Sequence, residues 1–180
     1  MTQSFPRSRM DRIYAFVARL ATWPVIGGLL AAFVLLFLGF QLRSRALGGV
    51  PTLDVRIGYT PDGARDVLAA LGESGRRLYA ATQLTLDVAF PLVYTALFAA
   101  LIVRGHDREP ARRLLAIPLL GGLMDVLENV TAATLAWTYT GTSSPLAWIT
   151  SAAGIVKYAC FVGSLLLVIV GGVRQLGRRA

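Results

Sequence analysis

Two acids and an amide lie close together near the middle of a long apolar stretch, residues 114–137. Asp125, Glu128 and Asn129 are spaced i, i+3 and i+4, so their side chains share one face of a helix. A carboxylate at the centre of a membrane helix costs about 2.5–3.5 kcal/mol on insertion scales. We therefore expect these acids to face the interior of a helix bundle, where they can carry protons or meet a cation.

A second apolar stretch, residues 78–103, carries a comparable polar face. Its residues follow the spacing i, i+4, i+8 and i+11, which places them on one side of a helix: Gln83, Asp87, Pro91 and Tyr94. Pro91 has no N–H to donate to the carbonyl of Asp87, so we expect a kink and a free carbonyl at that point. A free carbonyl beside a buried acid predicts a polar pocket.

Lys157, the only lysine of the chain, lies within the last apolar stretch. Counted from the ends of the helices at about 1.5 Å per residue, Asp87, Glu128 and Lys157 reach about the same depth. We expect them to meet, with Lys157 as the counter-ion. Because the acids outnumber this lysine, either one acid stays protonated or an arginine from the outer rim, Arg43 or Arg77, reaches the cluster.

The elements that must position these side chains follow from composition. The chain has 180 residues, of which 55% are hydrophobic and 16% charged, whereas a soluble domain has about 45–50% apolar and about 25% charged residues. The excess lies in stretches long enough to cross a bilayer. The predicted fold class is an all-α polytopic membrane protein, a bundle of four transmembrane helices forming a single domain, with spans at 24–42, 78–103, 114–137 and 146–173.

The longest polar segment, residues 43–76, separates the first two spans. Within it, Thr60, Pro61 and Asp62 are an N-cap, a first helical residue and a first-turn acid, and they predict a short amphipathic helix over 61–71. We expect this helix to lie flat on the outer end of the bundle as a lid. The basic residues 1–22 leave two interpretations open, a helix on the membrane surface or a lead-in turn of the first span.

The sequence YTPDGARDVLAALGESGRRLYAATQLTLDVAFPLVY at 59–94, followed by MDVLENV at 124–130, resembles a pattern in small uncharacterised bacterial four-helix membrane proteins. The resemblance covers about half the chain and implies a fold and a bacterial membrane, but no known activity. In outline, with Asp87 ahead of Pro91, the chain is also similar to the emopamil-binding protein and sigma-2 receptor superfamily. Those proteins hold sterol-like amines or sterol intermediates against buried acids, and their sterol isomerases use an intramembrane histidine, which this chain lacks.

Positively charged side chains indicate the orientation. Arginines concentrate in residues 1–22, in the loop 104–113 and in the C-terminal tail, whereas residues 138–145 carry none. Because loops rich in Lys and Arg stay in the cytoplasm, we expect a multi-pass protein of the bacterial cytoplasmic (inner) membrane with both termini cytoplasmic.

Three functions stay open. The first is a binding protein with an intramembrane pocket for a lipid-like or amine ligand. The second is a lipid-modifying enzyme that uses carboxyls as general acid and base. The third is an accessory subunit whose acidic cluster is purely structural, or a proton- or ion-coupled transporter. The candidate ligand-binding residues are Gln83, Asp87, Tyr94, Asp125, Glu128, Asn129 and Lys157.

Composition also limits cofactors and partners. The single cysteine allows no intrachain disulfide and the single histidine no histidine-rich metal site, so we expect neither a metal nor a cofactor. The net charge of +8 comes from arginines at the ends of spans, so nucleic acid is not an expected partner. The expected partners are the lipid bilayer, a small amphipathic ligand and a second copy of the chain in a homo-oligomer, with the first span as the oligomer face.

Overall fold

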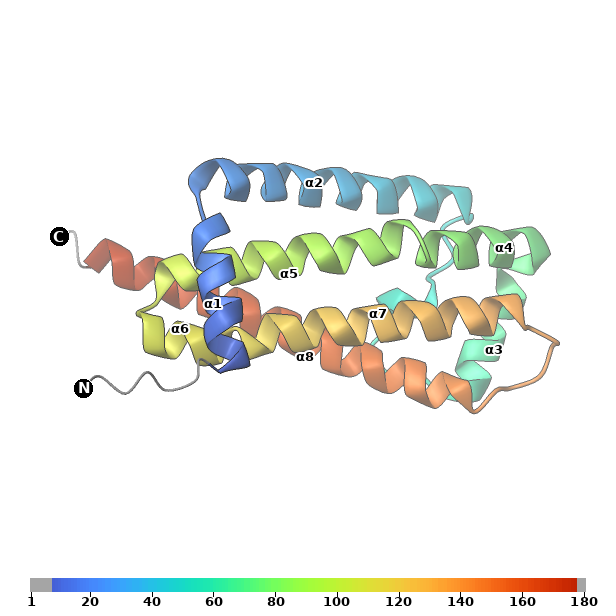
Figure 1. Cartoon of the computed structure of the whole chain (residues 1–180). Helices are drawn as coiled ribbons and strands as arrows, with labels where there is room; N and C mark the ends of the chain where they lie inside the picture. Colours follow the sequence, from blue (N-terminus) through green and yellow to red (C-terminus); the bar gives the residue numbers. More distant parts are fainter. Residues whose placement is uncertain (1–7, 178–180) are drawn as a thin grey trace.

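Helices make up most of the chain that the structure describes. The computed structural model describes residues 8–177, and this part contains helices and turns but no strand (Figure 1). Four helical segments are long and apolar enough to cross a membrane. The predicted all-α, polytopic membrane fold is thereby confirmed. The four segments are Trp23–Ala46, Gly72–Gly105, Arg108–Trp137 and Leu146–Gly177.

The second and third segments are each built from two helices. The α-helices in chain order are α1 Arg9–Leu20, α2 Trp23–Ala46, α3 Pro61–Ala70, α4 Gly72–Gln83, α5 Leu86–Gly105, α6 Arg108–Leu114, α7 Ala116–Trp137 and α8 Leu146–Gly177, and a short 3₁₀ helix, η1, spans Leu53–Val55. We call the end of the bundle that carries α3 the α3 end, and the opposite end, which carries α1 and α6, the α1 end (Figure 1).

The sequence predicts a kink at Asp87 and Pro91, but the irregular point of this segment lies earlier, between α4 and α5. Helical backbone bonding breaks at Leu84 and Thr85, where Thr85 has φ −121° and ψ −81°, and α5 then continues across Pro91. The break therefore lies about half a turn before Asp87, on the N-terminal side where a proline disturbs a helix.

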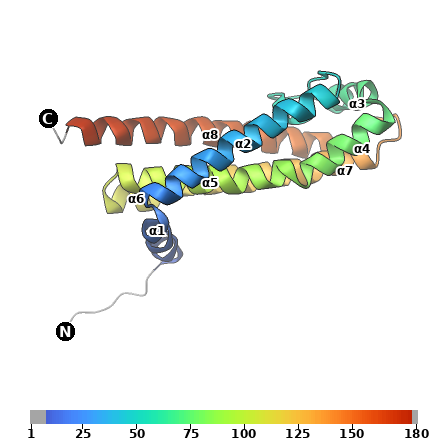
Figure 2. The same cartoon turned by 90° about the horizontal axis from the view of Figure 1, so that it is seen from above.

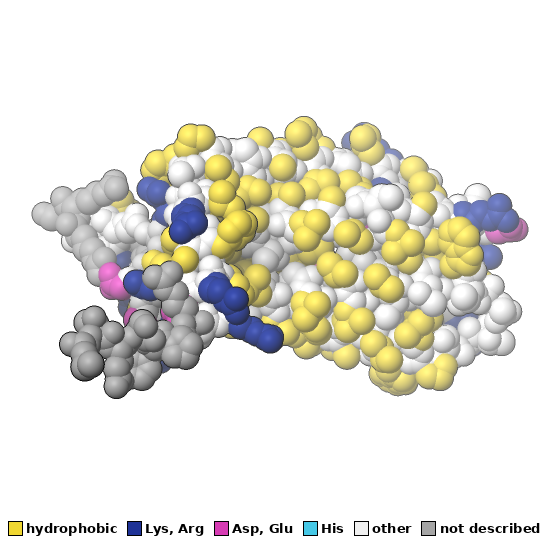
Figure 3. All heavy atoms as spheres, in the orientation of Figure 1, with side chains coloured by type: hydrophobic (Ala, Val, Ile, Leu, Met, Phe, Trp, Pro, Cys, Tyr) yellow, Lys and Arg dark blue, Asp and Glu magenta, His cyan; other side chains and the backbone are white. Residues whose placement is uncertain are grey.

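Helix α7 is the centre of the bundle. It packs most extensively against α8 and also contacts α4 and α5, whereas α2 packs along α5 (Figures 1 and 2). Hydrophobic side chains cover the middle of the molecule on the face shown in Figure 3, and Lys and Arg side chains gather towards its two ends. This distribution is the one expected of helices that expose apolar side chains to lipid.

The chain between α2 and α3 folds back against the bundle at the α3 end. Leu53 of η1 is fully buried, and it joins an apolar core with the buried face of α3, formed by Ala64, Val67 and Leu68. As the sequence predicts, Thr60 caps α3 by accepting a hydrogen bond from the Gly63 N–H at 3.2 Å. The expected short amphipathic helix is therefore present.

Glycines allow α5 and α8 to approach closely at the α1 end. A Cβ atom at Gly171 would lie 2.9 Å from Cε1 of His106 and 3.0 Å from Cα of Gly105, whereas a Cβ at the neighbouring Gly172 would have no atom within 4 Å. Small residues at such crossings let helix backbones touch.

We expect Gly171→Ala to destabilise the protein by about 1–3 kcal/mol, because the added methyl group overpacks this crossing. Gly172→Ala is the matched control, with the same gain in helix propensity and no clash. Thermal unfolding in detergent, followed by circular dichroism, measures both. Equal melting temperatures for the two variants would contradict the close approach.

Candidate functional site

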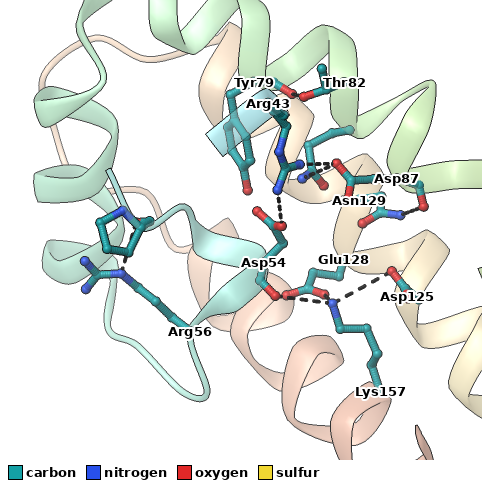
Figure 4. Close-up of polar contacts among 12 residues, drawn as sticks. Arg43, Asp54, Arg56, Tyr79, Thr82, Asp87, Asp125, Glu128, Asn129 and Lys157 are labelled. Carbon is teal, nitrogen blue, oxygen red and sulfur yellow. Dashed lines mark hydrogen bonds and ion pairs between the residues drawn. The ribbon is translucent and has the colours of Figure 1, made fainter. Parts of the chain in front are cut away.

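Arg43 at the end of α2 is the cation at the centre of a buried charge cluster (Figure 4). Its side chain is buried, and Nη2 donates to Oδ2 of Asp54 at 2.6 Å while Nη1 donates to Oδ2 of Asp87. Of the two arginines that could reach the cluster, Arg43 does so. Arg77 stays exposed on α4, where it pairs with Glu73 at 2.6 Å.

Asp54 enters the cluster from η1, outside the spans. Its carboxylate binds Arg43, and its backbone carbonyl accepts hydrogen bonds from Oη of Tyr158 at 2.8 Å and Nζ of Lys157 at 3.5 Å. Burial by itself would raise the pKa of this carboxyl, but the Arg43 guanidinium outweighs burial and holds the pKa below its usual value. Asp54 is therefore an ionised, buried partner of Arg43.

The two polar helix faces predicted from the sequence meet at Asp87. Nε2 of Gln83 donates to its Oδ2 at 3.0 Å, and Nδ2 of Asn129 on α7 donates to its backbone carbonyl at 2.7 Å (Figure 4). That carbonyl is the one that Pro91 leaves without a helical donor. A side chain from the neighbouring helix thus replaces the missing backbone hydrogen bond.

Lys157 on α8 is the second buried cation. It forms ion pairs with Glu128 and, at 3.8 Å, with Asp125, both on α7. Glu128 is fully buried and packs against Gly154, where a Cβ would lie 2.6 Å from its Oε1. The glycine therefore leaves the space that the Glu128 carboxylate occupies.

The cluster contains more acids than bases. Four carboxyls face two cations, so the group would carry two excess negative charges if every member were ionised. Several polar atoms buried beside it have no hydrogen-bond partner among the described residues, including Oε1 of Gln83, Oδ1 of Asn129 and Oη of Tyr79. Buried polar atoms are nearly always hydrogen-bonded, so the cluster has bonding capacity that the protein itself does not use.

A cavity of about 390 Å³ lies beside this cluster, between α2 and α8. Asp54, Asp87 and Asp125 contribute to its wall, as do Arg43 and Lys157. Most of the remaining wall is apolar, and its aromatic residues are Phe37, Phe40, Phe90, Tyr94, Tyr158 and Phe161. The cavity therefore combines carboxylates with aromatic rings at one site.

The predicted site residues fall into two groups. Asp87, Tyr94, Asp125 and Lys157 line the cavity, whereas Gln83, Glu128 and Asn129 lie behind its wall and contact the lining residues or their backbone.

Two charged lining residues lay outside the predicted set, Asp54 and Arg43, although Arg43 was a candidate counter-ion. An available signal for Asp54 was its place between Leu53 and Val55 in an otherwise polar segment. The residues that cover the cavity belong to 47–55, and none comes from the helix predicted at 61–71.

Comparison with protein-family models, with curated proteins and with solved structures gives no match to this chain. Within residues 8–177, no group of three or more His, Cys, Asp or Glu side chains is placed to hold a metal ion. The charge cluster and the cavity are therefore the features of this chain that bear on its function.

We expect Arg43→Gln to lower the free energy of unfolding by about 3–5 kcal/mol, because it leaves Asp54 and Asp87 as unpaired buried charges. The matched control is Arg45→Gln, an exposed position two residues further on, with an expected effect within about 0.5 kcal/mol. Adding Asp54→Asn and Asp87→Asn to Arg43→Gln should restore most of the loss. Thermal unfolding in detergent compares the four proteins, and no recovery in the triple variant would show that the loss is not electrostatic.

The Asn129 bond to the Asp87 carbonyl can be tested by a double-mutant cycle. Asn129→Leu should cost about 1–3 kcal/mol in the wild-type chain, because it leaves a buried carbonyl without a donor. Pro91→Ala restores an N–H four residues after Asp87, so the same Asn129→Leu change should cost clearly less in that background. An identical loss of stability in both backgrounds would mean that Asn129 does not compensate for Pro91.

Proposed function

We propose that this protein binds an amphipathic, lipid-like molecule with an amine head in the cavity between α2 and α8. The observation that carries the proposal is an excess of carboxylates over cations on the wall of an otherwise largely apolar, aromatic cavity. Organic cations are attracted both to carboxylates and to the faces of aromatic rings. An intramembrane site with surplus acid and aromatic walls therefore favours a ligand that combines positive charge with apolar surface.

The individual contacts indicate where the amine would bind. Asp54 and Asp87 each accept a hydrogen bond from Arg43 through one carboxylate oxygen, and Glu128 forms a close ion pair with Lys157 behind the cavity wall. Asp125 lines the cavity, and its ion pair with Lys157 is long, at 3.8 Å. This ion pair is the longest in the cluster, so we assign the Asp125 carboxylate as the main acceptor for the ligand amine.

The apolar part of the ligand would lie towards the lipid. Phe37 of α2 lines the cavity and is 51% exposed, so the cavity wall continues to the surface of the transmembrane region. The volume of about 390 Å³ is within the range of about 300–1,000 Å³ typical of small-molecule sites. A ligand with a single chain could therefore place its head at Asp125 and its tail between α2 and α8.

We also infer the location and orientation of the chain. Exposed arginines surround the α1 end, and the short connection at 138–145, at the α3 end, has none. By the positive-inside rule, we infer that the α1 end lies on the cytoplasmic side of a bacterial inner membrane. In this orientation the cavity, which lies towards the α3 end, serves molecules in the outer leaflet.

Dodecylamine and dodecanol, which share one chain length, test whether charge matters for binding. We expect dodecylamine to raise the melting temperature of the detergent-solubilised protein more than dodecanol does. We expect Asp125→Asn to reduce the affinity of the protein for dodecylamine by about tenfold or more, because the amine loses a close charge partner. Asp66→Asn, at an exposed acid, is the matched control.

Native mass spectrometry of the same variants gives an independent measurement. A bound small molecule that is retained by the wild type and by Asp66→Asn, but lost from Asp125→Asn, would support the proposal. Equal stabilisation by amine and alcohol would contradict recognition of the amine. If no molecule binds and Asp125→Asn is merely less stable, the cluster has a structural role.

A further inference from the structure

Helix α1 lies across the α1 end of the bundle, at a steep angle to the four long helices (Figures 1 and 2). It contacts the end of α5 and the start of α6, which are the places where those segments would leave the membrane. Ser8 and Asp11 form a capping box at its first turn, so the helix has a defined beginning. In a membrane that encloses the four long helices, a helix in this position would run along the surface.

Contacts from two other elements hold α1 in this orientation. Arg112 of α6 forms an ion pair with Asp11 at 3.1 Å, and the Arg108 guanidinium lies over the ring of Tyr14. Arg104 of α5 donates to the backbone carbonyl of Ala21 at 2.8 Å, just after α1 ends. These contacts determine which face of α1 is turned towards the bundle and which is turned away.

The face turned away combines arginines with an aromatic ring. At about 100° per residue, Arg9, Arg12, Phe16 and Arg19 fall within about 80° of one another around the helix. All four side chains are exposed, Phe16 by 64%. None of the three arginines forms an ion pair with another residue of the part of the chain that the structure describes. This face therefore has unused positive charge around an unburied apolar group.

The surroundings of α1 strengthen this positive charge. Eight described arginines lie at the α1 end against three acids, an excess of five positive charges, and Arg7, Arg178 and Arg179 lie outside the described residues. The arginines are Arg9, Arg12, Arg19, Arg104, Arg108, Arg112, Arg113 and Arg174, and the acids are Asp11, Asp107 and Glu109. A partner for this surface must supply negative charge over a wide area and accept an apolar ring between the charges.

We propose that the outer face of α1, formed by Arg9, Arg12, Phe16 and Arg19, binds the headgroups of anionic phospholipids in the leaflet at the α1 end. Guanidinium groups bind phosphate through paired, charge-assisted hydrogen bonds. Phe16 then packs among the upper acyl carbons, as aromatic side chains of interfacial helices do. A protein partner of opposite charge would satisfy the arginines, but a phospholipid surface matches both components and is continuous with the membrane around the spans.

Trp23, which is 62% exposed and three residues beyond Leu20 at the end of α1, can report on the lipids beside this surface. Trp137→Phe and Trp148→Phe, at the two exposed tryptophans that flank the 138–145 connection, leave Trp23 as the only tryptophan of the chain. This protein is placed in phosphatidylcholine vesicles that contain either brominated phosphatidylglycerol or brominated phosphatidylcholine at equal mole fraction. Bromine quenches tryptophan fluorescence only at short range, so the two vesicles compare anionic and neutral lipids beside α1.

We expect brominated phosphatidylglycerol to quench Trp23 roughly twofold more strongly than brominated phosphatidylcholine, because the arginines enrich anionic lipid locally. The excess should disappear when Arg9, Arg12 and Arg19 are all changed to Gln. It should persist when Arg45, Arg56 and Arg77, three exposed arginines at the α3 end, are changed to Gln as the matched control.

Two results would overturn the proposal. One is equal quenching by the two brominated lipids in the protein with native arginines, and the other is an equal loss in the two triple-Gln variants. A melting temperature measured for each variant in detergent identifies any protein that is not folded. If a triple-Gln variant fails that test, the single variants Arg12→Gln and Arg45→Gln replace the pair, with a smaller loss of excess quenching expected only for Arg12→Gln.

Discussion

The bridge from Arg43 to Asp54 and Asp87 is the interaction on which the rest of the structure depends. A charge inside a membrane protein is tolerated only beside an opposite charge, since removing an ion from water costs several kcal/mol even after the protein relaxes. This bridge joins the end of α2, the η1 segment and the start of α5. It therefore anchors α2, which otherwise packs mainly along α5, and it brings Asp54 from a connecting segment into the bundle.

The same environment requires that backbone groups be satisfied within the protein. Pro91 leaves the Asp87 carbonyl without a helical donor, and Asn129 donates a hydrogen bond to it instead. Asp54 lies in η1, outside any long helix, and its backbone carbonyl accepts hydrogen bonds from Lys157 and Tyr158. Most of the residues singled out for possible chemistry thus also complete hydrogen bonds in the fold. Gln83, Glu128 and Asn129 direct their side chains to lining residues or their backbone, so they support the cavity wall without lining it.

The two ends of the molecule differ in how they use charge. Near the α3 end, acids exceed bases in a buried group beside an aromatic cavity, which is the basis for the proposed amine ligand. At the α1 end, arginines exceed acids on an exposed surface around α1, which is the basis for the proposed contact with anionic lipid. The two proposals therefore assign separate places to a cationic molecule within the bilayer and to anionic headgroups at its surface.

The sequence by itself determined the four long apolar helices, the polar faces that carry Asp87, Asp125 and Glu128, and the Thr60 cap of α3. These features follow from local rules, namely the length needed to cross a bilayer, the helical period of 3.6 residues and the capping of orphan N–H groups. Only the tertiary structure decided that Arg43 rather than Arg77 enters the cluster, that Asp54 joins it, and that residues 47–55 cover the cavity. Those outcomes depend on the path of an irregular segment between two helices, and no periodicity in the sequence specifies where such a segment passes.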